Sequence, residues 1–133
     1  MEKNKQLVMK VLKDIGYEPE LDSDQDIRLC VEMKRFYFFM PDDEEECYVN
    51  LVLPQFTDIK EGKEIIALAA CNIITRDMKF LKVYVDKNHE SVSASCEFIY
   101  TDEDSLRENI VNSMEVMGIV RTFYKRKCAE LEN

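Results

Sequence analysis

The N-terminal residues carry a hydrophobic pattern that is typical of an amphipathic helix. Apolar side chains recur three and four positions apart, with Lys10, Lys13 and Asp14 between them. Such spacing places the apolar residues on one face of a helix. Gly16 follows where a left-handed C-cap would end it, so we predict a helix over residues 3–15. The apolar residues of this face are Leu7, Val8, Val11, Leu12 and Ile15.

The hydrophobic period then changes from that of a helix to that of a strand. Apolar and polar side chains alternate over residues 27–33, as expected of a half-buried strand. A tight turn at Lys34-Arg35 would lead into an aromatic strand over residues 36–40. We predict a third strand over residues 47–53 and expect it to stop at Pro54, which cannot donate a ladder hydrogen bond.

The second half of the chain repeats these elements in a shorter order. The pattern over residues 61–77 predicts a helix that is apolar on nearly every face. The β-branched and aromatic residues of 80–85 and 91–100 predict the two strands of a hairpin. Ser105 with Glu108 has the pattern of a capping box, which would begin a long last helix. The predicted order is α-β-β-β-α-β-β-α. Hairpin connections predict an α+β fold with an antiparallel sheet packed against helices.

Composition limits the partners that the chain can have. Of its 133 residues 46% are hydrophobic and 34% are charged, and 27 acidic against 18 basic side chains give a net charge of -9. This length is typical of one domain, which we place over residues 1–133. Because an acidic chain repels phosphate backbones and anionic lipid, we expect neither nucleic acid nor a membrane as partner.

The cysteines and the apolar runs indicate the compartment. Five cysteines, without a C-x-x-C pair, suit neither a disulfide framework nor a zinc site, so we expect free thiols in a reducing cytoplasm. The apolar run Leu7–Met9 is too short for the core of a signal peptide. The most apolar stretch, Ile65–Ile74, is too short to span a bilayer. We therefore predict a cytoplasmic protein.

Three features that resemble catalytic or metal sites are incomplete. Asp22-Ser23-Asp24-Gln25-Asp26 begins like a calcium loop of the EF-hand, but Ile27 and Met33 stand where that loop needs Gly and Glu. His89, the only histidine, falls in the predicted hairpin turn. Three glycines cannot form a phosphate-binding loop. We expect no enzyme activity, no metal and no cofactor.

The predicted helix over residues 61–77 contains one polar residue that needs an explanation. Asn72 would be costly if it were buried without a hydrogen-bond partner, and Arg76 lies one turn later on the same face. One interpretation is a hydrogen bond from the helix to the sheet. The other is a polar notch at which a partner docks, which makes Asn72 and Arg76 candidate interaction residues.

The last helix has more apolar side chains than one sheet can cover. One stripe consists of Leu106, Ile110, Met114, Met117, Tyr124 and Cys128. A second set lies beside it and consists of Val111, Val116, Ile119, Val120 and Phe123. Because large exposed apolar patches commonly mark interfaces, we predict a homodimer or a hetero-complex built on the helices. Met114, Met117, Val120 and Phe123 are the candidate contacts. The competing explanation is that the first and last helices bury the central helix within one chain.

Five stretches, which span most of the chain, carry a resemblance to a known family. They are Lys5 to Leu12 with Gly16-Tyr17, Arg35-Phe36-Tyr37, Leu51-Val52-Leu53-Pro54, Ala69-Ala70-Cys71-Asn72 with Arg76, and Leu81-Lys82-Val83-Tyr84. Together they resemble the YbjN-domain family of bacteria, whose members are named for sensory transduction regulation. The resemblance implies a type III secretion chaperone-like fold that pairs through helices, and it brings no catalytic residue with it.

Two hypotheses about function follow from these observations. The first is a non-enzymatic protein-interaction module, chaperone-like or regulatory, that binds a protein or peptide partner. The second is a small-ligand sensor or an unrecognised enzyme with a pocket between sheet and helices. A cavity with convergent polar or ionisable groups would favour the second hypothesis.

Overall fold

Six strands form one antiparallel sheet, in the order β1-β2-β3-β4-β6-β5, in a computed structural model that describes residues 2–133. The predicted fold class, α+β with an antiparallel sheet packed against helices, is confirmed. The helices are α1 (Lys3–Ile15), α2 (Glu64–Asp77) and α3 (Glu103–Glu132). The strands are β1 (Glu20–Leu21), β2 (Ile27–Val31), β3 (Lys34–Phe39), β4 (Tyr48–Asp58), β5 (Leu81–Val85) and β6 (Ser91–Ile99).

The core lies on one face of the sheet, as the alternating pattern predicts. Ile27 pairs with Phe38 and Phe38 with Leu51, and all three side chains are buried. Tyr37 and Phe39 point to the other face, where their rings stack with centroids 5.9 Å apart. Half of the aromatic side chains of β3 therefore build the core and half lie on the opposite face.

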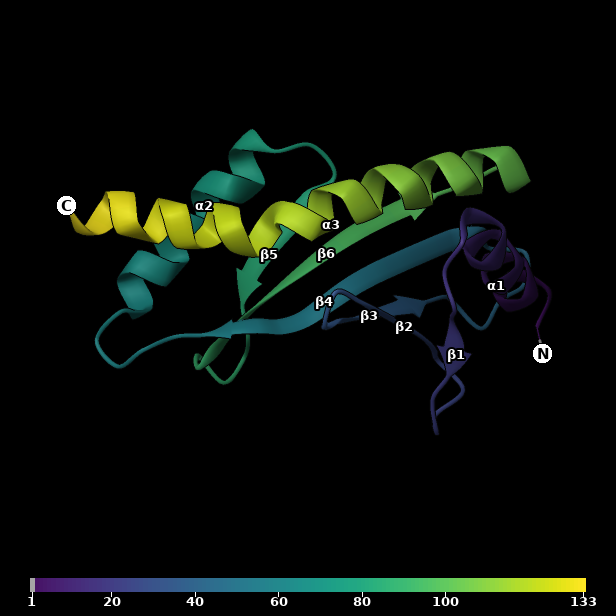
Figure 1. Cartoon of the computed structure of the whole chain (residues 1–133), viewed down its shortest axis with the longest axis horizontal. Helices are drawn as coiled ribbons and strands as arrows, with labels where there is room; N and C mark the ends of the chain where they lie inside the picture. The colour runs from purple at the N-terminus through teal and green to yellow at the C-terminus, as the bar shows by residue number, and fades with distance from the viewer. Residues whose placement is uncertain (1) are drawn as a thin grey trace.

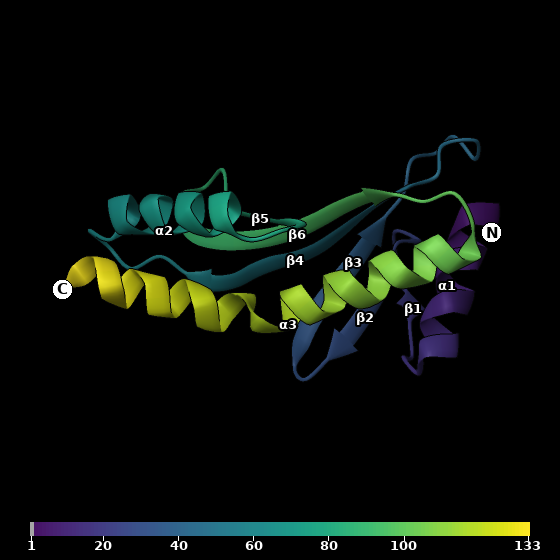
Figure 2. The same ribbon diagram turned by 90° about the horizontal axis from the view of Figure 1, so that it is seen from above.

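Helices α1 and α3 lie on the core face of the sheet, and α2 packs against the edge strand β5 and against α3. Figures 1 and 2 show α3 running along the length of the molecule, with α1 near its beginning and α2 beside its C-terminal half. Within residues 2–133 no helix covers the opposite face. On that face Glu97 of β6 accepts hydrogen bonds from Lys82 Nζ at 2.7 Å and from the Tyr48 hydroxyl at 2.8 Å.

Helix α1 ends as the sequence predicts. Gly16 has φ of 114°, and its N–H donates to the carbonyl of Lys13 at 3.0 Å. The N–H of Tyr17 donates to the carbonyl of Leu12 at 2.9 Å. This pattern closes a helix through a left-handed residue, which glycine adopts without steric cost.

The turn between β2 and β3 lies two residues earlier than predicted. Glu32 and Met33 both have positive φ, 50° and 67°, and form the two-residue turn, whereas Lys34 pairs with Val31 as the first residue of β3. Two consecutive left-handed residues suit the twist of a hairpin. The prediction of a turn at Lys34-Arg35 was wrong because neither Glu32 nor Met33 is a residue that usually signals such a turn.

Strand β4 does not stop at Pro54 as predicted. The pairing with β6 is irregular between Leu53 and Thr57, and the proline lies inside this irregular stretch. Gln55 there has φ of 48°, and its N–H donates to Ser93 Oγ at 2.8 Å. A bulge of this kind accommodates a residue that cannot donate to the ladder.

Two further boundaries differ from the prediction. The two-residue strand β1 was missed because it has no alternating pattern, and an ion pair between its Glu20 and Arg28 joins it to β2. Helix α3 begins at Glu103, and its capping box pairs Asp102 with Ser105, so Glu108 has no part in it. The actual N-cap is an aspartate, which serves as well as the serine that was expected there.

Candidate functional site

Helix α2 has an apolar face on both sides, and the chain covers only one of them. Ala70 and Ile74 are buried on the inner side, which packs against β5 and α3. On the outer side Ile65 is 82% exposed and Leu68 is 47% exposed. The competing explanation, in which the first and last helices bury the central helix within one chain, does not account for this outer side.

Asn72 and Arg76 lie on this outer side of α2, and both are exposed. Arg76 forms an ion pair with the adjacent Asp77, with Nε 2.7 Å from Oδ1. The hydrogen bond from helix to sheet that we expected of Asn72 is made by Thr75. Its hydroxyl accepts the N–H of Val83 at 2.9 Å and lies 3.1 Å from the carbonyl of Val83. Asn72 therefore remains available to a partner.

The candidate contact residues on α3 lie elsewhere than expected. Met114, Met117 and Val120 are buried in the core, because α3 packs on the sheet and contacts both α1 and α2. These three side chains therefore offer little or no surface to a partner, and their role as contacts stays a prediction that their burial does not favour. Phe123 is half-buried, and the Arg126 guanidinium lies 5.7 Å from the centre of its ring.

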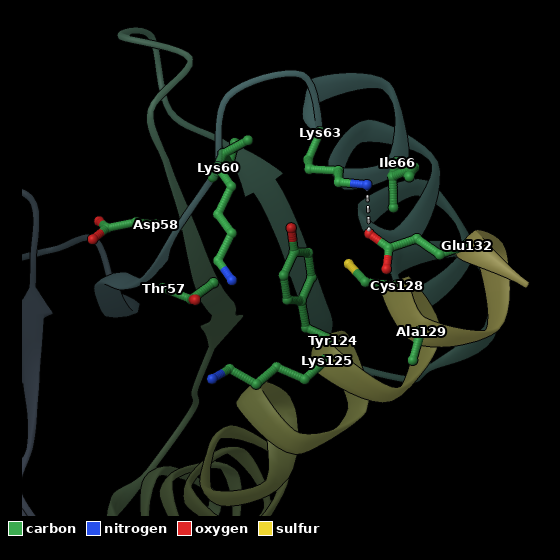
Figure 3. A pocket seen from close by; sticks show the side chains of 11 residues that line it. Thr57, Asp58, Lys60, Lys63, Ile66, Tyr124, Lys125, Cys128, Ala129 and Glu132 are labelled. Carbon is green, nitrogen blue, oxygen red and sulfur yellow. Dashed lines mark ion pairs between the residues drawn. The ribbon is translucent and has the colours of Figure 1, made fainter.

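A second site, which we call the basic pocket, opens where the end of β4 and the start of α2 meet the C-terminal half of α3. Its volume is about 300 Å³. Figure 3 shows the Tyr124 ring standing between Lys60 and Cys128, with Lys125 beside it. Six of the residues that line the basic pocket decide its chemistry: Lys60, Lys63, Ile66, Tyr124, Lys125 and Cys128.

The charges of the basic pocket are only partly neutralised. Lys63 Nζ lies 3.5 Å from a carboxylate oxygen of Glu132. Lys60 and Lys125 form no ion pair within the described part of the chain. Burial and the neighbouring Cys128 thiol raise the pKa of Tyr124, so its phenol is neutral at physiological pH. The basic pocket thus has exposed ammonium groups around it, whereas the Tyr124 ring, which is 6% exposed, offers it little surface.

Sequence reasoning missed the basic pocket. Of the basic cluster Arg121, Lys125, Arg126 and Lys127, only Lys125 lines it. Lys60 and Lys63 stand about sixty positions earlier in a loop without a recognisable motif. The basic cluster gave no signal of this pocket, because three of its four residues do not line it and all four precede the last turn of α3.

The acidic segment before β2 forms a turn. One carboxylate oxygen from each of Asp22, Asp24 and Asp26 lies within 4.8 Å of the others. Asp22 Oδ1 accepts the N–H groups of Asp24 and Asp26, each at 2.9 Å. Burial and Asp22 raise the pKa of Asp26. The segment is thereby shaped by its own hydrogen bonds, and the expectation that it binds no calcium stays a prediction.

His89 and the buried cysteines do not come together as catalytic groups. His89 is exposed on the hairpin between β5 and β6, and its Nδ1 lies 2.5 Å from a carboxylate oxygen of Glu64. Burial raises the pKa of the Cys71 thiol to about 12 and that of Cys96 to about 11. Both thiols are therefore neutral at physiological pH, and a neutral thiol is a poor nucleophile.

The observed fold defines a class of protein: an α+β domain with three helices packed against a six-stranded antiparallel sheet. One solved structure with this fold is that of YbjN from E. coli, described as a candidate transcription regulator. The TM-score is 0.71 over 94% of this chain and 92% of that chain, at 10% sequence identity. The resemblance to the YbjN family is thus confirmed at the level of the fold.

The other comparisons gave no match. No family model matches the sequence, and no curated protein matches it. Among the described residues, no helix is both long enough and apolar enough to cross a membrane.

Proposed function

We propose that this chain is a non-enzymatic interaction module that binds a protein through the outer face of α2, and that this protein is a second copy of the chain. The observation that carries the proposal is the exposure of Ile65 and Leu68 on a helix whose inner face is already packed. Burying apolar surface contributes about 25 cal/mol per Å², so two such helices gain free energy by pairing.

The charges on α2 favour a second copy over an unrelated partner. Glu64 lies at the N-terminal end of the helix and Arg76 near its C-terminal end. If two copies of α2 pack antiparallel by their outer faces, with the twofold axis at the level of position 70, Glu64 of each faces Arg76 of the other. These contacts would add to the pairs with His89 and Asp77 within each chain. The same register places Leu68 opposite Asn72. A surface that complements itself in this way is what a symmetric dimer requires.

Two further observations support a role without catalysis. His89 is engaged with Glu64 on an exposed hairpin, and the thiols of Cys71 and Cys96 are neutral. The net charge of -9 opposes binding to nucleic acid or to anionic lipid. A regulatory role would then be exercised through protein contacts, in keeping with the description of YbjN as a candidate regulator.

The proposal is tested by matched substitutions of two exposed isoleucines. Ile65→Glu places a charge on the outer face of α2, and Ile99→Glu does so on a 75% exposed side chain of β6. We expect Ile65→Glu to raise the dimer dissociation constant by about tenfold or more and Ile99→Glu to leave it unchanged. Sedimentation equilibrium measures both constants. Equal constants for the two variants would contradict the proposal.

A charge exchange tests the antiparallel register. Glu64→Arg places two arginines opposite each other across the proposed interface and should weaken the dimer, as should Arg76→Glu alone. The double variant restores opposite charges, so its dissociation constant should return toward that of the unaltered chain. If the two single effects simply add in the double variant, the two side chains do not meet and the register is wrong.

A further inference from the structure

We propose that His89 makes the pairing of two α2 helices sensitive to pH, and that the dimer weakens when the imidazole is protonated. The inference rests on the proposed dimer and concerns the regulation of that same interface. The observation that carries it is the contact of His89 with Glu64, the residue that faces Arg76 of the second copy in the proposed register. His89 is the only histidine of the chain, and histidine is the side chain whose charge ordinarily changes between pH 5 and 8.

The hairpin between β5 and β6 holds His89 at the beginning of α2. The N–H of His89 donates to the carbonyl of Asp86 at 2.8 Å, and the N–H of Asp86 donates to the carbonyl of Ser91 at 2.9 Å, so hydrogen bonds fix the turn. His89 Nδ1 lies 2.5 Å from a carboxylate oxygen of Glu64, the first residue of the helix. Because side chains four positions apart share one side of a helix, Glu64 belongs to the same row as Leu68. His89 therefore stands beside the surface that the proposed dimer buries.

The other charges around the hairpin balance one another. The N–H of Ile59 donates to the carbonyl of Glu90 at 2.8 Å, so the segment before α2 runs beside the hairpin. The ionisable side chains of the hairpin and of this segment are three acidic and three basic: Asp86, Glu90, Glu61, Lys87, Lys60 and Lys63. Lys63 is also paired with Glu132 at the end of α3. Among the described residues, His89 has one ion-pair partner, the carboxylate at the start of α2. A charge on His89 therefore acts on the interface mainly beside that carboxylate.

Protonation of His89 opposes the pairing of the two helices. Arg76 and Asp77 keep their charges near neutral pH, because their contact raises the pKa of the guanidinium and lowers that of the carboxyl. In the dimer Arg76 of one copy faces Glu64 of the other, so an imidazolium there brings two positive charges to one carboxylate. Asp77, one position further along, offsets part of this repulsion. The approach of Arg76 thus makes His89 harder to protonate, and by reciprocity a protonated His89 binds the second copy more weakly.

Sedimentation equilibrium at about pH 5.5 and about pH 8, at one ionic strength, measures this effect on both sides of the range in which histidine titrates. A symmetric dimer contains the contact twice, and exposed charges interact weakly. We therefore expect the dissociation constant of the unaltered chain to be roughly fivefold higher at the lower pH. His89→Asn should remove the difference, and asparagine tolerates the left-handed backbone of this position, where φ is 60°. Lys87→Gln, an exposed residue of the same hairpin, is the matched control and should keep the difference.

A further variant tests whether the effect acts through the second copy. Arg76→Gln removes the charge that faces Glu64, so its dimer should be weaker than that of the unaltered chain but should not weaken further at the lower pH. Circular dichroism of each protein at both pH values verifies the fold. The inference alone is overturned if the unaltered dimer is as strong at the lower pH, if His89→Asn or Arg76→Gln keeps the difference, or if Lys87→Gln loses it. A chain that is monomeric at every concentration overturns the proposed dimer and this inference together.

Discussion

Helices α1 and α2 both pack an apolar face into the core, yet their outer faces differ. The outer face of α1 carries Lys10 and Lys13, and Lys10 Nζ lies 2.9 Å from a carboxylate oxygen of Glu103 on α3. The outer face of α2 carries Ile65 and Leu68. A solvated helix normally has polar residues opposite its buried stripe, as α1 does. The contrast is the reason for our proposal that α2, unlike α1, packs against a second copy of the chain.

The buried faces of α1 and α2 should contribute similarly to the free energy of unfolding. Leu12→Ala on α1 and Ile74→Ala on α2 remove side chains that are almost fully buried, so each should lower the free energy of unfolding by about 2–5 kcal/mol. Lys13→Ala, on the exposed side of α1, should change it by less than about 0.5 kcal/mol. Urea denaturation followed by circular dichroism measures all three. A negligible effect of Ile74→Ala would mean that α2 does not pack as described.

Replacing glycine by alanine should have opposite effects on stability at the C-cap of α1 and in the middle of α3. Gly16 ends α1 with φ of 114°, where a side chain is strained, so Gly16→Ala should destabilise the protein by about 1 kcal/mol. Gly118 lies within α3, and a Cβ added there would meet no atom within 4 Å. Gly118→Ala should therefore stabilise the protein, by about 0.5–1 kcal/mol. Thermal unfolding distinguishes the two, and stabilisation by both substitutions would show that the C-cap of α1 is not left-handed.

The open face of the sheet carries a charge whose hydrogen bonds come from two neighbouring strands, β4 and β5. Hydrogen bonds from Lys82 and Tyr48 lower the pKa of Glu97 from its ordinary value of 4.5. A carboxylate whose pKa is lower in the folded state stabilises the fold above its unfolded pKa and loses that effect as the pH falls through the folded value. Glu97→Gln should therefore reduce the loss of stability on acidification below about pH 4.5. Urea denaturation at a series of pH values measures the free energy of unfolding of both proteins. If this free energy falls equally with pH in the unaltered chain and in Glu97→Gln, the hydrogen bonds of Glu97 do not stabilise the fold.

The sequence predicted the elements whose signals are local. The spacing of apolar residues and Gly16 fixed the bounds of α1, and alternation found the strands of the core. The prediction failed at Glu32, Met33 and Pro54. At these positions pairing with a neighbouring strand determines the backbone conformation, and the residues themselves give no local signal of that conformation. Tertiary context commonly overrides such local preferences.

The candidate site was harder to predict than the fold. An apolar pattern shows that a side chain avoids water, but it does not show whether the chain itself or a partner provides the cover. Met117 and Val120 proved to be covered by the chain, whereas Ile65 and Leu68 are not. The basic pocket gave no signal because Lys60 and Lys125 approach only when α2 packs against α3.

The mass of the unaltered chain in solution tests the account most directly. Light scattering at micromolar protein concentration and moderate salt gives this mass without any substitution. The pairing of two α2 helices predicts twice 15.7 kDa. A mass of 15.7 kDa that does not change as the concentration rises would contradict the proposal that the outer face of α2 binds a second copy.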